Sequence, residues 1–522
     1  MGKKTYKTPG VYVEEVSAFP SSVAAVETAI PAFIGYTPQA DLNGNDCTFV
    51  PTKITSFLEF QHIFGFPDSP EPVQQYSPQY YLVRQNSKPK EGDFILIGSE
   101  YYSIVPDAHS IYYLYNSVKL FYQNGGGKAY IVSVGGYGKT AGTPLQLGAP
   151  LVNPNVQLAD LLKGVQALKK KEEVSMYICP EATLLPLAEN GTLMQQMLLQ
   201  NSEMRTAISI FDIIGGNREN PLGNDVDIEA FRNHTGATGL GFGAAYYPFV
   251  GTTMMGERDL NYTNLFGGDV RKLATVLNST LPPEERVLEL LKAIYNSENS
   301  GSISENHREL LYTSTTYRTI ISAVLKCVNL LPSSGGMAGI ITRVDNTRGV
   351  WKAPANVSMA GVASLPIQIN NTEQQGLNVD AISGKSINAL RNLAGRGILV
   401  WGARTLAGND NEWRYINVRR TMIFIEQSCK NACKGFVFEP NDANTWVRIQ
   451  GMIENFLNSL WRQGGLAGAT PKDAYFVKCG LGTTMTTNDI LDGRLIVNIG
   501  VALIRPAEFM IISFSQQQMV SP

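Results

Sequence analysis

The chain has 522 residues, of which 44% are hydrophobic and 17% are charged, and its formal net charge is −2. This length predicts about two to four domains, and the near-neutral charge excludes the overall positive field that holds nucleic acid through its phosphates. A charged fraction well below the usual ~25% predicts that partners cover part of the surface.

The first 19 residues are predicted to be extended. Pro9 and Gly10 disfavour a helix, and three strand-forming residues follow them, Val11, Tyr12 and Val13. This segment contains lysines but no apolar stretch, so we expect no secretory signal. No apolar run in the chain approaches the ~18 residues of a membrane span.

Residues 23–37 have the apolar pattern of a buried strand. Residues 41–118 are rich in Pro, Tyr, Gln and Asn with weak periodicity, and we predict an irregular insertion that contains strands. Strands and helices alternate from residue 120 onward, which predicts an α/β domain. The predicted elements are a strand within 120–134, a helix at 158–168, strands at 176–180 and 241–250, and helices at 284–296 and 317–330.

The segment 331–356 is rich in glycine and proline, which predicts a rigid, irregular connector. Gly336 and Gly339 allow a positive φ or the close approach of another backbone. Asp345 and Arg348 are near enough in sequence to form an ion pair, and the two isoleucines that follow Gly339 favour a short strand. A packed loop of an ordinary α/β protein is the alternative.

Beyond residue 356 the pattern predicts a compact α+β unit. Its elements are a helix at 386–393, a strand at 398–405, helices at 418–433 and 444–463, and strands at 474–479 and 494–505. Residues 508–518 are predicted to form a strand and a polar tail. Strand-like apolar ends are a liability when unpaired, so each end pairs either within its own domain or with another chain.

The six cysteines contain no CxxC pair. Cys429 and Cys433 lie on the apolar face of a predicted helix, where free cysteine behaves as a small hydrophobe. A metal pair is the alternative, but no histidine or second cysteine pair lies nearby to complete a site. We expect no metal or cofactor, and the cysteine pattern predicts synthesis in a reducing cytoplasm.

Motifs of catalysis are weak in this chain. The glycine run at 124–128 precedes a strand, whereas a phosphate-binding loop follows a strand and opens a helix. No GxSxG motif is present, and the four histidines are far apart. Asp212, at the end of a predicted strand, is the best catalytic candidate, although a capping or turn role is favoured. An α/β hydrolase-like enzyme with an appended domain therefore remains the alternative function.

Five segments together resemble contractile tail sheath proteins of phages and phage-derived injection systems. They are residues 8–16 with 28–37, 120–134, 244–250, 336–356, and the region 396–480. The resemblance covers nearly the whole chain and is weakest in 41–118. Its central signature contains Gly336, Gly339, Asp345, Arg348, Trp351 and Pro354.

The resemblance implies a structural protein rather than an enzyme. It implies an outer α/β domain of subtilisin-like topology, without activity, and an inner α+β domain formed by both chain ends. The implied domains are an N-terminal arm (1–22), the outer domain (23–365, with the 41–118 insertion), the inner domain (366–505) and a C-terminal arm (506–522). Subunits would form stacked hexameric rings around an inner tube and contract between baseplate and terminal cap proteins. Assembly would occur in a bacterial cytoplasm, and the particle would be a phage virion or a released contractile particle.

The resemblance also implies that the chain ends add strands to the sheets of neighbouring subunits. The residues expected in this linkage are Val11, Tyr12, Val13, Phe509, Met510, Ile511, Ile512 and Phe514. On the 444–463 helix, Arg448, Glu454 and Arg462 are candidates for contact with the tube. A helix that merely covers its own sheet is the alternative.

Overall fold

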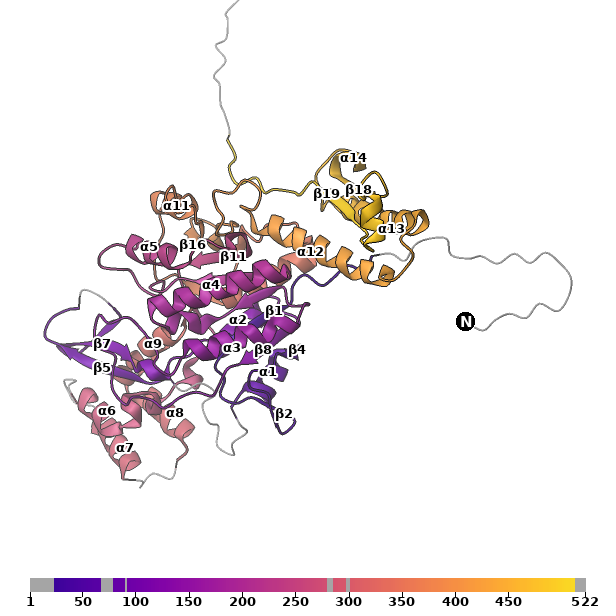
Figure 1. Cartoon of the computed structure of the whole chain (residues 1–522). Coiled ribbons are helices and arrows are strands. Elements are labelled where there is room, and N and C mark those ends of the chain that lie inside the picture. Colours follow the sequence, from indigo (N-terminus) through magenta and orange to yellow (C-terminus); the bar gives the residue numbers. More distant parts are fainter. Residues whose placement is uncertain (1–22, 67–77, 90–91, 279–284, 297–300, 512–522) are drawn as a thin grey trace, which may run out of the picture. The chain divides into compact units, whose positions relative to one another are not determined.

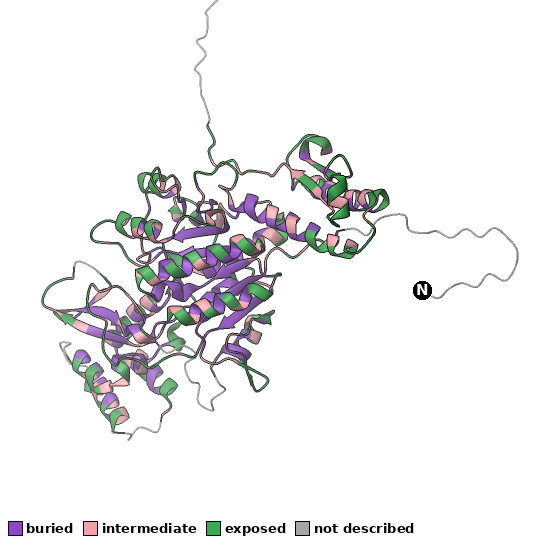
Figure 2. Cartoon of the chain, viewed as in Figure 1, coloured by how far each residue is buried: buried purple, intermediate pink, exposed green. Residues whose placement is uncertain are grey.

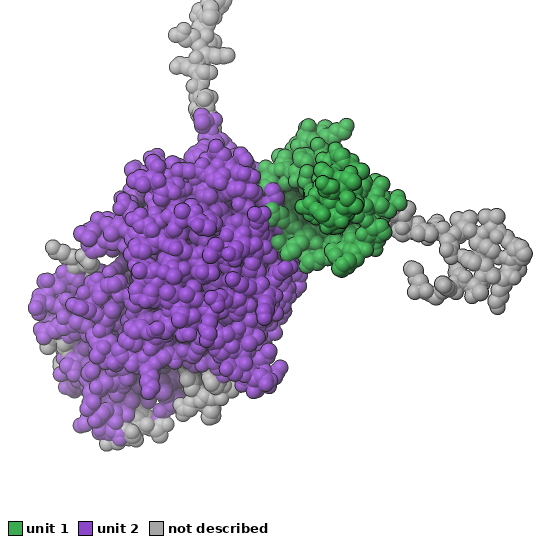
Figure 3. Space-filling view, viewed as in Figure 1, with its two compact units in different colours: residues 1–26, 425–504 green, residues 27–424, 505–522 purple. Residues whose placement is uncertain are grey.

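The computed structural model describes residues 23–66, 78–89, 92–278, 285–296 and 301–511. By its contacts the chain divides into two compact units, which Figure 3 colours separately. The large unit comprises residues 27–424 and 505–522, and the small unit comprises residues 1–26 and 425–504. The small unit is thus inserted between two parts of the large one.

A nine-stranded sheet runs through the large unit (Figure 1). Its six parallel strands are, in spatial order, β16 (Ile387–Leu393), β11 (Gly243–Tyr247), β10 (Ile208–Asp212), β9 (Met176–Ile178), β1 (Pro31–Gly35) and β8 (Ala129–Ser133). Antiparallel strands extend the edges, with β4 (Thr52–Ile54) beside β8, and β17 (Gly397–Val400) and β14 (Val357–Ser358) beyond β16. Every residue of β1, β8, β9, β10 and β11 is buried (Figure 2), as parallel strands require when helices cover both faces.

Two pairs of helices cover the sheet. The first pair is α2 (Leu114–Gln123) and α10 (Ser334–Arg348), which contact each other, and the second is α3 (Leu158–Ala167) and α4 (Leu187–Met204). Helix α2 connects β1 to β8, toward one edge of the sheet. Helices α3 and α4 connect β8 to β9 and β9 to β10, toward the other edge. Because crossovers between parallel strands are right-handed, the two pairs lie on opposite faces.

Smaller elements complete the large unit. A three-stranded antiparallel sheet contains β5 (Tyr80–Gln85), β7 (Glu100–Pro106) and β6 (Phe94–Ile97). The other helices are α1 (Phe57–Phe64), α5 (Asp225–His234), α6 (Val270–Leu277), α7 (Glu285–Tyr295), α8 (Ile303–Thr313), α9 (Thr315–Val328) and α11 (Asn371–Asn378). The short strands are β2 (Asp41–Leu42), β3 (Asn45–Asp46), β12 (Val250–Thr252), β13 (Leu330–Leu331) and β15 (Val362–Ser364).

The small unit contains one long helix packed on a two-stranded sheet. Its elements are α13 (Ala443–Arg462), α14 (Pro471–Ala474), β18 (Tyr475–Cys479), α15 (Thr487–Leu491), β19 (Val497–Val501) and the second half of α12 (Ile416–Cys433). Asp442 begins α13 by accepting a hydrogen bond from Thr445 N at 2.9 Å. The helix buries Ile449, Ile453 and Leu457, and it contacts β18, which pairs antiparallel with β19.

Three of the six predicted elements of the C-terminal part are confirmed, and three differ. The strand predicted at 398–405 is shorter, because β17 covers Gly397–Val400. The helices at 418–433 and 444–463 and the strand at 474–479 correspond to α12, α13 and β18. The predicted strand at 494–505 is shorter, because β19 covers Val497–Val501, and it is only partly buried. The helix predicted at 386–393 is wrong, because Ile387–Leu393 form β16 beside β11.

The segment 331–356 is not an irregular connector. Residues Ser334–Arg348 form helix α10, and the isoleucines predicted as a strand, Ile340 and Ile341, lie buried inside it. The predicted domain boundary at 365/366 also differs from the boundary given by contacts, which lies at 424/425. Strands β16 and β17 follow residue 365 but pair within the large sheet, which keeps them in the large unit.

Candidate functional site

Helix α10 carries glycines where it meets α2. A Cβ atom on Gly335 would lie 2.6 Å from Ser117 O, and one on Gly339 would lie 2.5 Å from Phe121 O. Gly336 is equally crowded, since its Cβ would lie 2.2 Å from Met359 Sδ. Of the two roles predicted for these glycines, close backbone approach is therefore the one the structure shows.

Two buried carboxylates begin the helices of this pair. Asp212, at the end of β10, accepts hydrogen bonds from Ser334 N at 2.9 Å and Ser333 Oγ at 3.2 Å, at the start of α10. Glu181, which follows β9, accepts from Leu114 N at 2.8 Å at the start of α2. Burial raises the pKa of Glu181 to about 8 and the pKa of Asp212 to about 6. Asp212 thus has the capping role that the sequence favoured over catalysis.

Asp345 forms a buried ion pair, but its partner is not Arg348. Its carboxylate accepts from Arg420 Nη2 at 2.6 Å and Nη1 at 2.8 Å, and the two side chains are 2% and 4% exposed. Thr28 Oγ1 donates to the same carboxylate at 2.6 Å, and Arg420 Nη2 donates to Thr28 O at 2.8 Å. The predicted Asp345–Arg348 pair is therefore wrong, and Arg348 is exposed in the last turn of α10.

The last two signature residues follow α10. The Trp351 ring lies beside Gly349, whose φ is 88° and whose Cβ, if present, would lie 2.4 Å from that ring. Trp351 O accepts from Asn417 Nδ2 at 2.8 Å, at the start of α12, and Pro354 is buried. The signature thus joins the segment before β1, α10 and α12, whose residues are far apart in the sequence, through hydrogen bonds inside the large unit.

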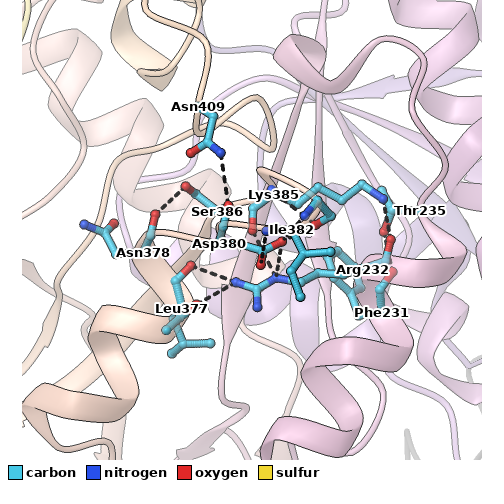
Figure 4. A network of polar contacts seen from close by, with 12 residues as sticks. Phe231, Arg232, Thr235, Leu377, Asn378, Asp380, Ile382, Lys385, Ser386 and Asn409 are labelled. Atoms are coloured by element: carbon cyan, nitrogen blue, oxygen red, sulfur yellow. Dashed lines mark hydrogen bonds and ion pairs between the residues drawn. The ribbon is translucent and has the colours of Figure 1, made fainter.

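A second polar network holds the loop that follows α11 (Figure 4). Arg232 of α5 donates from Nη2 to Gly376 O at 2.7 Å and from Nε to Lys385 O at 3.1 Å, and Lys385 Nζ donates back to Arg232 O. Asp380 accepts from Ser383 N at 2.8 Å, and one of its oxygens lies 3.7 Å from Arg232 Nε. These contacts hold the loop in one conformation. No sequence motif indicated this network, because its members come from three separate segments, which are α5, residues 376–386 and Asn409.

The loop carries an exposed apolar side chain. Ile382, labelled in Figure 4, is 97% exposed, and its backbone N donates to Asp380 Oδ1 at 3.2 Å. Asn409 Nδ2 donates to Asp380 O at 3.0 Å and links the loop to the segment after β17. The large unit therefore presents Ile382 from a fixed turn.

The three candidate tube-contact residues lie along α13. Arg448 and Arg462 are exposed, and Glu454 is half-buried. Arg448 lies 4.0 Å from Glu439 and over the Phe436 ring, while Glu454 accepts from Gln450 Nε2 at 2.8 Å. These contacts are local and solvent-accessible, so they can be exchanged for contacts with another molecule.

The expected linkage residues lie partly outside the described residues. Val11, Tyr12 and Val13 precede the described part of the chain, and Ile512 and Phe514 follow it. Phe509, Met510 and Ile511 are described, and they are 70%, 82% and 89% exposed in extended chain without strand partners in the described ranges. The structure therefore shows an unpaired apolar run at this end.

Among the residues that the structure describes, no group of three His, Cys, Asp or Glu side chains could hold a metal ion. Burial raises the pKa of the Cys429 thiol to about 12, as suits a cysteine that packs as a hydrophobe. Within the same described ranges, no helix is long and apolar enough to cross a membrane.

Two family models of phage tail sheath proteins match this chain. The model of the phage tail sheath protein central domain matches residues 289–406, and the model of the phage tail sheath C-terminal domain matches residues 408–517. Together the two matches include helices α8 to α15 and residues 425–504 of the small unit. The segments 336–356 and 396–480, on which the resemblance partly rested, lie within these matches.

Curated tail sheath proteins match a shorter part of the chain. The tail sheath protein of Vibrio phage KVP40 is 26% identical over 139 residues, which are 26% of this chain and 20% of that protein. The tail sheath protein of Burkholderia phage BcepMu is 29% identical over 143 residues, which are 27% of this chain and 30% of that protein. The chain thus spans about a fifth to a third of the length of the curated relatives it matches.

Solved structures of contractile particles match nearly the whole chain. A chain of the anti-feeding prophage helical sheath in the contracted state is 25% identical, with 98% of this chain and 100% of that chain covered and a TM-score of 0.58. A chain of the anti-feeding prophage baseplate is 27% identical, with 98% and 100% covered and a TM-score of 0.56. The sheath complex of an extracellular contractile injection system, at 24% identity and a TM-score of 0.57 over 99% of both chains, shows the same fold. The resemblance to contractile tail sheath proteins is confirmed.

Proposed function

We propose that this chain, a relative of contractile tail sheath proteins, is the structural subunit of a contractile sheath in a phage or a phage-derived injection system. The observation that carries the proposal is the near full-length similarity to a chain of the contracted anti-feeding prophage sheath. The two tail sheath family matches and the curated tail sheath relatives point the same way.

In the proposed assembly, subunits stack as hexameric rings around an inner tube, between baseplate and terminal cap proteins. The anti-feeding prophage baseplate structure, which contains a similar chain, was six-fold symmetrised. Subunits that contact each other through different surfaces form open helical stacks rather than closed dimers. Such a particle assembles in a bacterial cytoplasm and is then part of a virion or of a released particle. The subunit itself neither inserts into a membrane nor binds nucleic acid.

The subunits of this assembly are linked by strand addition. The small unit offers a two-stranded sheet, β18 with β19, whose outer edges have no partner strand in the described ranges. Both arms are candidates to fill these edges, with Val11, Tyr12 and Val13 from one end and residues 509–514 from the other. Main-chain hydrogen bonds give such linkages strength, and they persist while the units move.

Contraction is proposed as a change between two packings of the same subunit. In the extended sheath, Arg448, Glu454 and Arg462 on α13 make weak contacts with the tube. A trigger at the baseplate rotates the subunits outward, the large units gain contacts, and the sheath shortens and drives the tube through the target membrane. Two packings of one sequence that differ by a modest free energy per subunit are enough for such a transition. In this assembly the large unit takes the outer position, with the subtilisin-like topology expected of the family, and the small unit the inner one.

The hydrolase alternative gains no support from the site. Asp212, its best catalytic candidate, is buried and accepts hydrogen bonds from the start of α10. It therefore has a structural task that explains its position at the end of β10.

Negative-stain microscopy of the purified full-length chain tests the proposal. We expect tubes or stacked rings at high protein concentration, and deletion of residues 1–18 should leave folded subunits that form neither. Deletion of residues 508–522 should likewise leave folded subunits that form neither tubes nor rings. Full-length protein that stays monomeric under all these conditions would contradict the proposal. Unfolding on either deletion would mean that the arm pairs within its own unit.

A further inference from the structure

The C-terminal arm begins at an unusual place in the fold. The chain leaves the large unit at residue 424, forms the small unit through residue 504, and then returns to the large unit. Glu508 is the only charged residue between Pro506 and the last residue, Pro522. The arm thus carries a single charge, which lies just before its apolar run.

Several side chains of the large unit hold the Glu508 carboxylate. Arg404 donates to it from Nη2 at 2.7 Å and from Nε at 2.9 and 3.1 Å, in the two-pronged geometry that suits a guanidinium and a carboxylate. Tyr415 Oη donates at 2.9 Å and Asn378 Nδ2 donates at 2.8 Å. The side chains of Arg404 and Glu508 are only 4% and 19% exposed, so solvent screens this pair weakly.

Arg404, which binds the Glu508 carboxylate, is itself held in place by hydrogen bonds. Arg404 N donates to Asn388 Oδ1 at 2.7 Å, and Asn388 Nδ2 donates to Arg404 O at 2.8 Å and to Ala245 O at 3.1 Å. These bonds attach Arg404 to strands β16 and β11 of the large sheet. The side chain that binds Glu508 is therefore attached to the core of the large unit.

The same site is connected to the network of Figure 4. Arg404 Nη1 donates to Asn378 O at 3.0 Å, and Ser386 Oγ donates to that oxygen at 2.6 Å. Burial alone would raise the pKa of Glu508, but hydrogen bonds from Arg404 and Asn378 and the charge of Arg404 outweigh it and leave the pKa lowered. The carboxylate is therefore charged at neutral pH.

We propose that Glu508 is the anchor of the C-terminal arm, which Arg404, Tyr415 and Asn378 hold on the large unit so that the apolar run 509–511 is presented to a second copy of this chain. A second copy is the occupant because Phe509, Met510 and Ile511 are apolar and 70–89% exposed, and the proposed sheath is built from copies of this chain. In a second copy, the outer edges of the sheet formed by β18 and β19 have no partner strand in the described ranges, and an extended apolar run can add to such an edge.

The anchor determines which unit's movement the C-terminal arm passes on to the neighbouring subunit. The family resemblance assigned the C-terminal arm to the inner domain, whereas the anchor makes its origin a part of the large unit. Movement of the large unit would then pull directly on the neighbouring subunit that holds the arm. This inference rests on the proposed sheath function for its partner, but the anchor itself can be tested without assembly.

Limited chymotrypsin digestion of the full chain tests the anchor. The protease cuts after Phe509 only when the residues around it are free to enter its active site, whereas Phe514 lies farther from Glu508. We expect Glu508→Ala to raise the rate of cutting after Phe509, relative to cutting after Phe514, by at least about tenfold. Tyr415→Phe, which removes one hydrogen bond, should give a smaller increase. The control Glu412→Ala, an exposed carboxylate in the same unit, should change nothing.

Assembly of the same variants tests the positioning role. If full-length protein forms tubes, Glu508→Ala should shorten or abolish them although the arm is intact, and Glu412→Ala should not. Equal cutting rates in Glu508→Ala and the unchanged chain would overturn the anchor. Faster cutting with normal tubes would overturn its positioning role. If the unchanged chain forms no tubes at all, the sheath proposal fails, while the digestion result still decides whether the anchor exists.

Discussion

The large and small units differ in how completely their sheets are buried. In the large unit, helices cover both faces of the parallel strands, and buried charges such as Asp345 and Arg420 have partners at hydrogen-bond distance. In the small unit, one helix covers one face of a two-stranded sheet, and Phe476 on β18 is 52% exposed. Phe438, just before α13, is fully exposed with a φ of 70°.

This difference indicates a division of labour within the chain. A sheet of two strands is at best marginally stable without further strands or a covering layer, and exposed apolar groups on a soluble protein mark surfaces for partners. The core of the large unit is complete by itself, whereas the small unit leaves sheet edges and apolar side chains available. Substitutions in the core of the large unit should therefore affect folding, whereas substitutions on the surface of the small unit should affect assembly.

The largest effect on folding is expected at the buried ion pair of the large unit. Asp345→Asn leaves the Arg420 guanidinium buried without a compensating charge, and we expect it to lower the free energy of unfolding by ~3–5 kcal/mol. Urea unfolding followed by hydrogen exchange of peptides from the two units measures this loss. Arg348→Ala is the matched control, because Arg348 is exposed on the same helix and should change stability by less than ~0.5 kcal/mol. Equal losses of stability in the two variants would contradict the Asp345–Arg420 pair and favour the Asp345–Arg348 pair that was predicted from the sequence.

The buried carboxylate Glu181 should make the large unit less stable as pH rises. Its folded pKa of about 8 lies above the ordinary 4.5, so the folded chain keeps a proton that the unfolded chain releases. The free energy of unfolding should therefore fall between pH 4.5 and 8, by up to ~5 kcal/mol from this group. Glu181→Gln should remove this share of the slope and leave stability near pH 4.5 almost unchanged. Unfolding curves across this pH range measure it, and a slope in the variant equal to that of the unchanged chain would refute it. Asp212, whose pKa burial raises to about 6, should leave a smaller slope in both proteins.

A smaller effect is expected where α10 meets α2. Gly335→Ala places a methyl group against Ser117 O, and we expect a net loss of ~1–3 kcal/mol even though alanine favours helices. The matched control lies in the small unit, where a Cβ on Gly451 of α13 would meet no atom within 4 Å. Gly451→Ala should therefore stabilise its helix by ~0.5–1 kcal/mol. Thermal unfolding of both variants measures the contrast, and a gain at both positions would refute the close packing of α10.

Elements with a clear period could be predicted from the sequence, and buried elements could not. Helix α13 was found because Ile449, Ile453 and Leu457 recur at helical spacing on one face. Helix α10 was missed because it is buried on nearly all sides, so it shows no polar face, and its glycines resemble those of a loop. Strand β16 was mistaken for a helix because Ile387, Leu390 and Leu393 recur every three residues, and so short a segment fits either structure until its neighbour β11 is known.

The signature residues were found without their partners. Asp345 was singled out, but Arg420 lies 75 residues farther along the chain and only the fold brings it within 2.6 Å. Arg404 and Glu508 are 104 residues apart in the sequence, so their ion pair could likewise not be predicted. Local patterns therefore identified which residues matter, whereas their roles depended on contacts between distant segments.

The smallest effect on folding is expected for the exposed arginines of α13, and it decides between two roles for that helix. Arg448→Ala removes only a 4.0 Å contact with Glu439 and a position over Phe436, so stability should change by less than ~1 kcal/mol. Arg286→Ala, which breaks a similar exposed pair with Glu309 at 3.8 Å in the large unit, is the control. If both variants fold equally well but only Arg448→Ala loses sheaths in microscopy of particles that contain a tube, the α13 charges serve contact with another molecule. A stability loss above ~2 kcal/mol for Arg448→Ala alone would instead mean that this face of α13 supports its own unit, and the tube-contact proposal would have to be withdrawn.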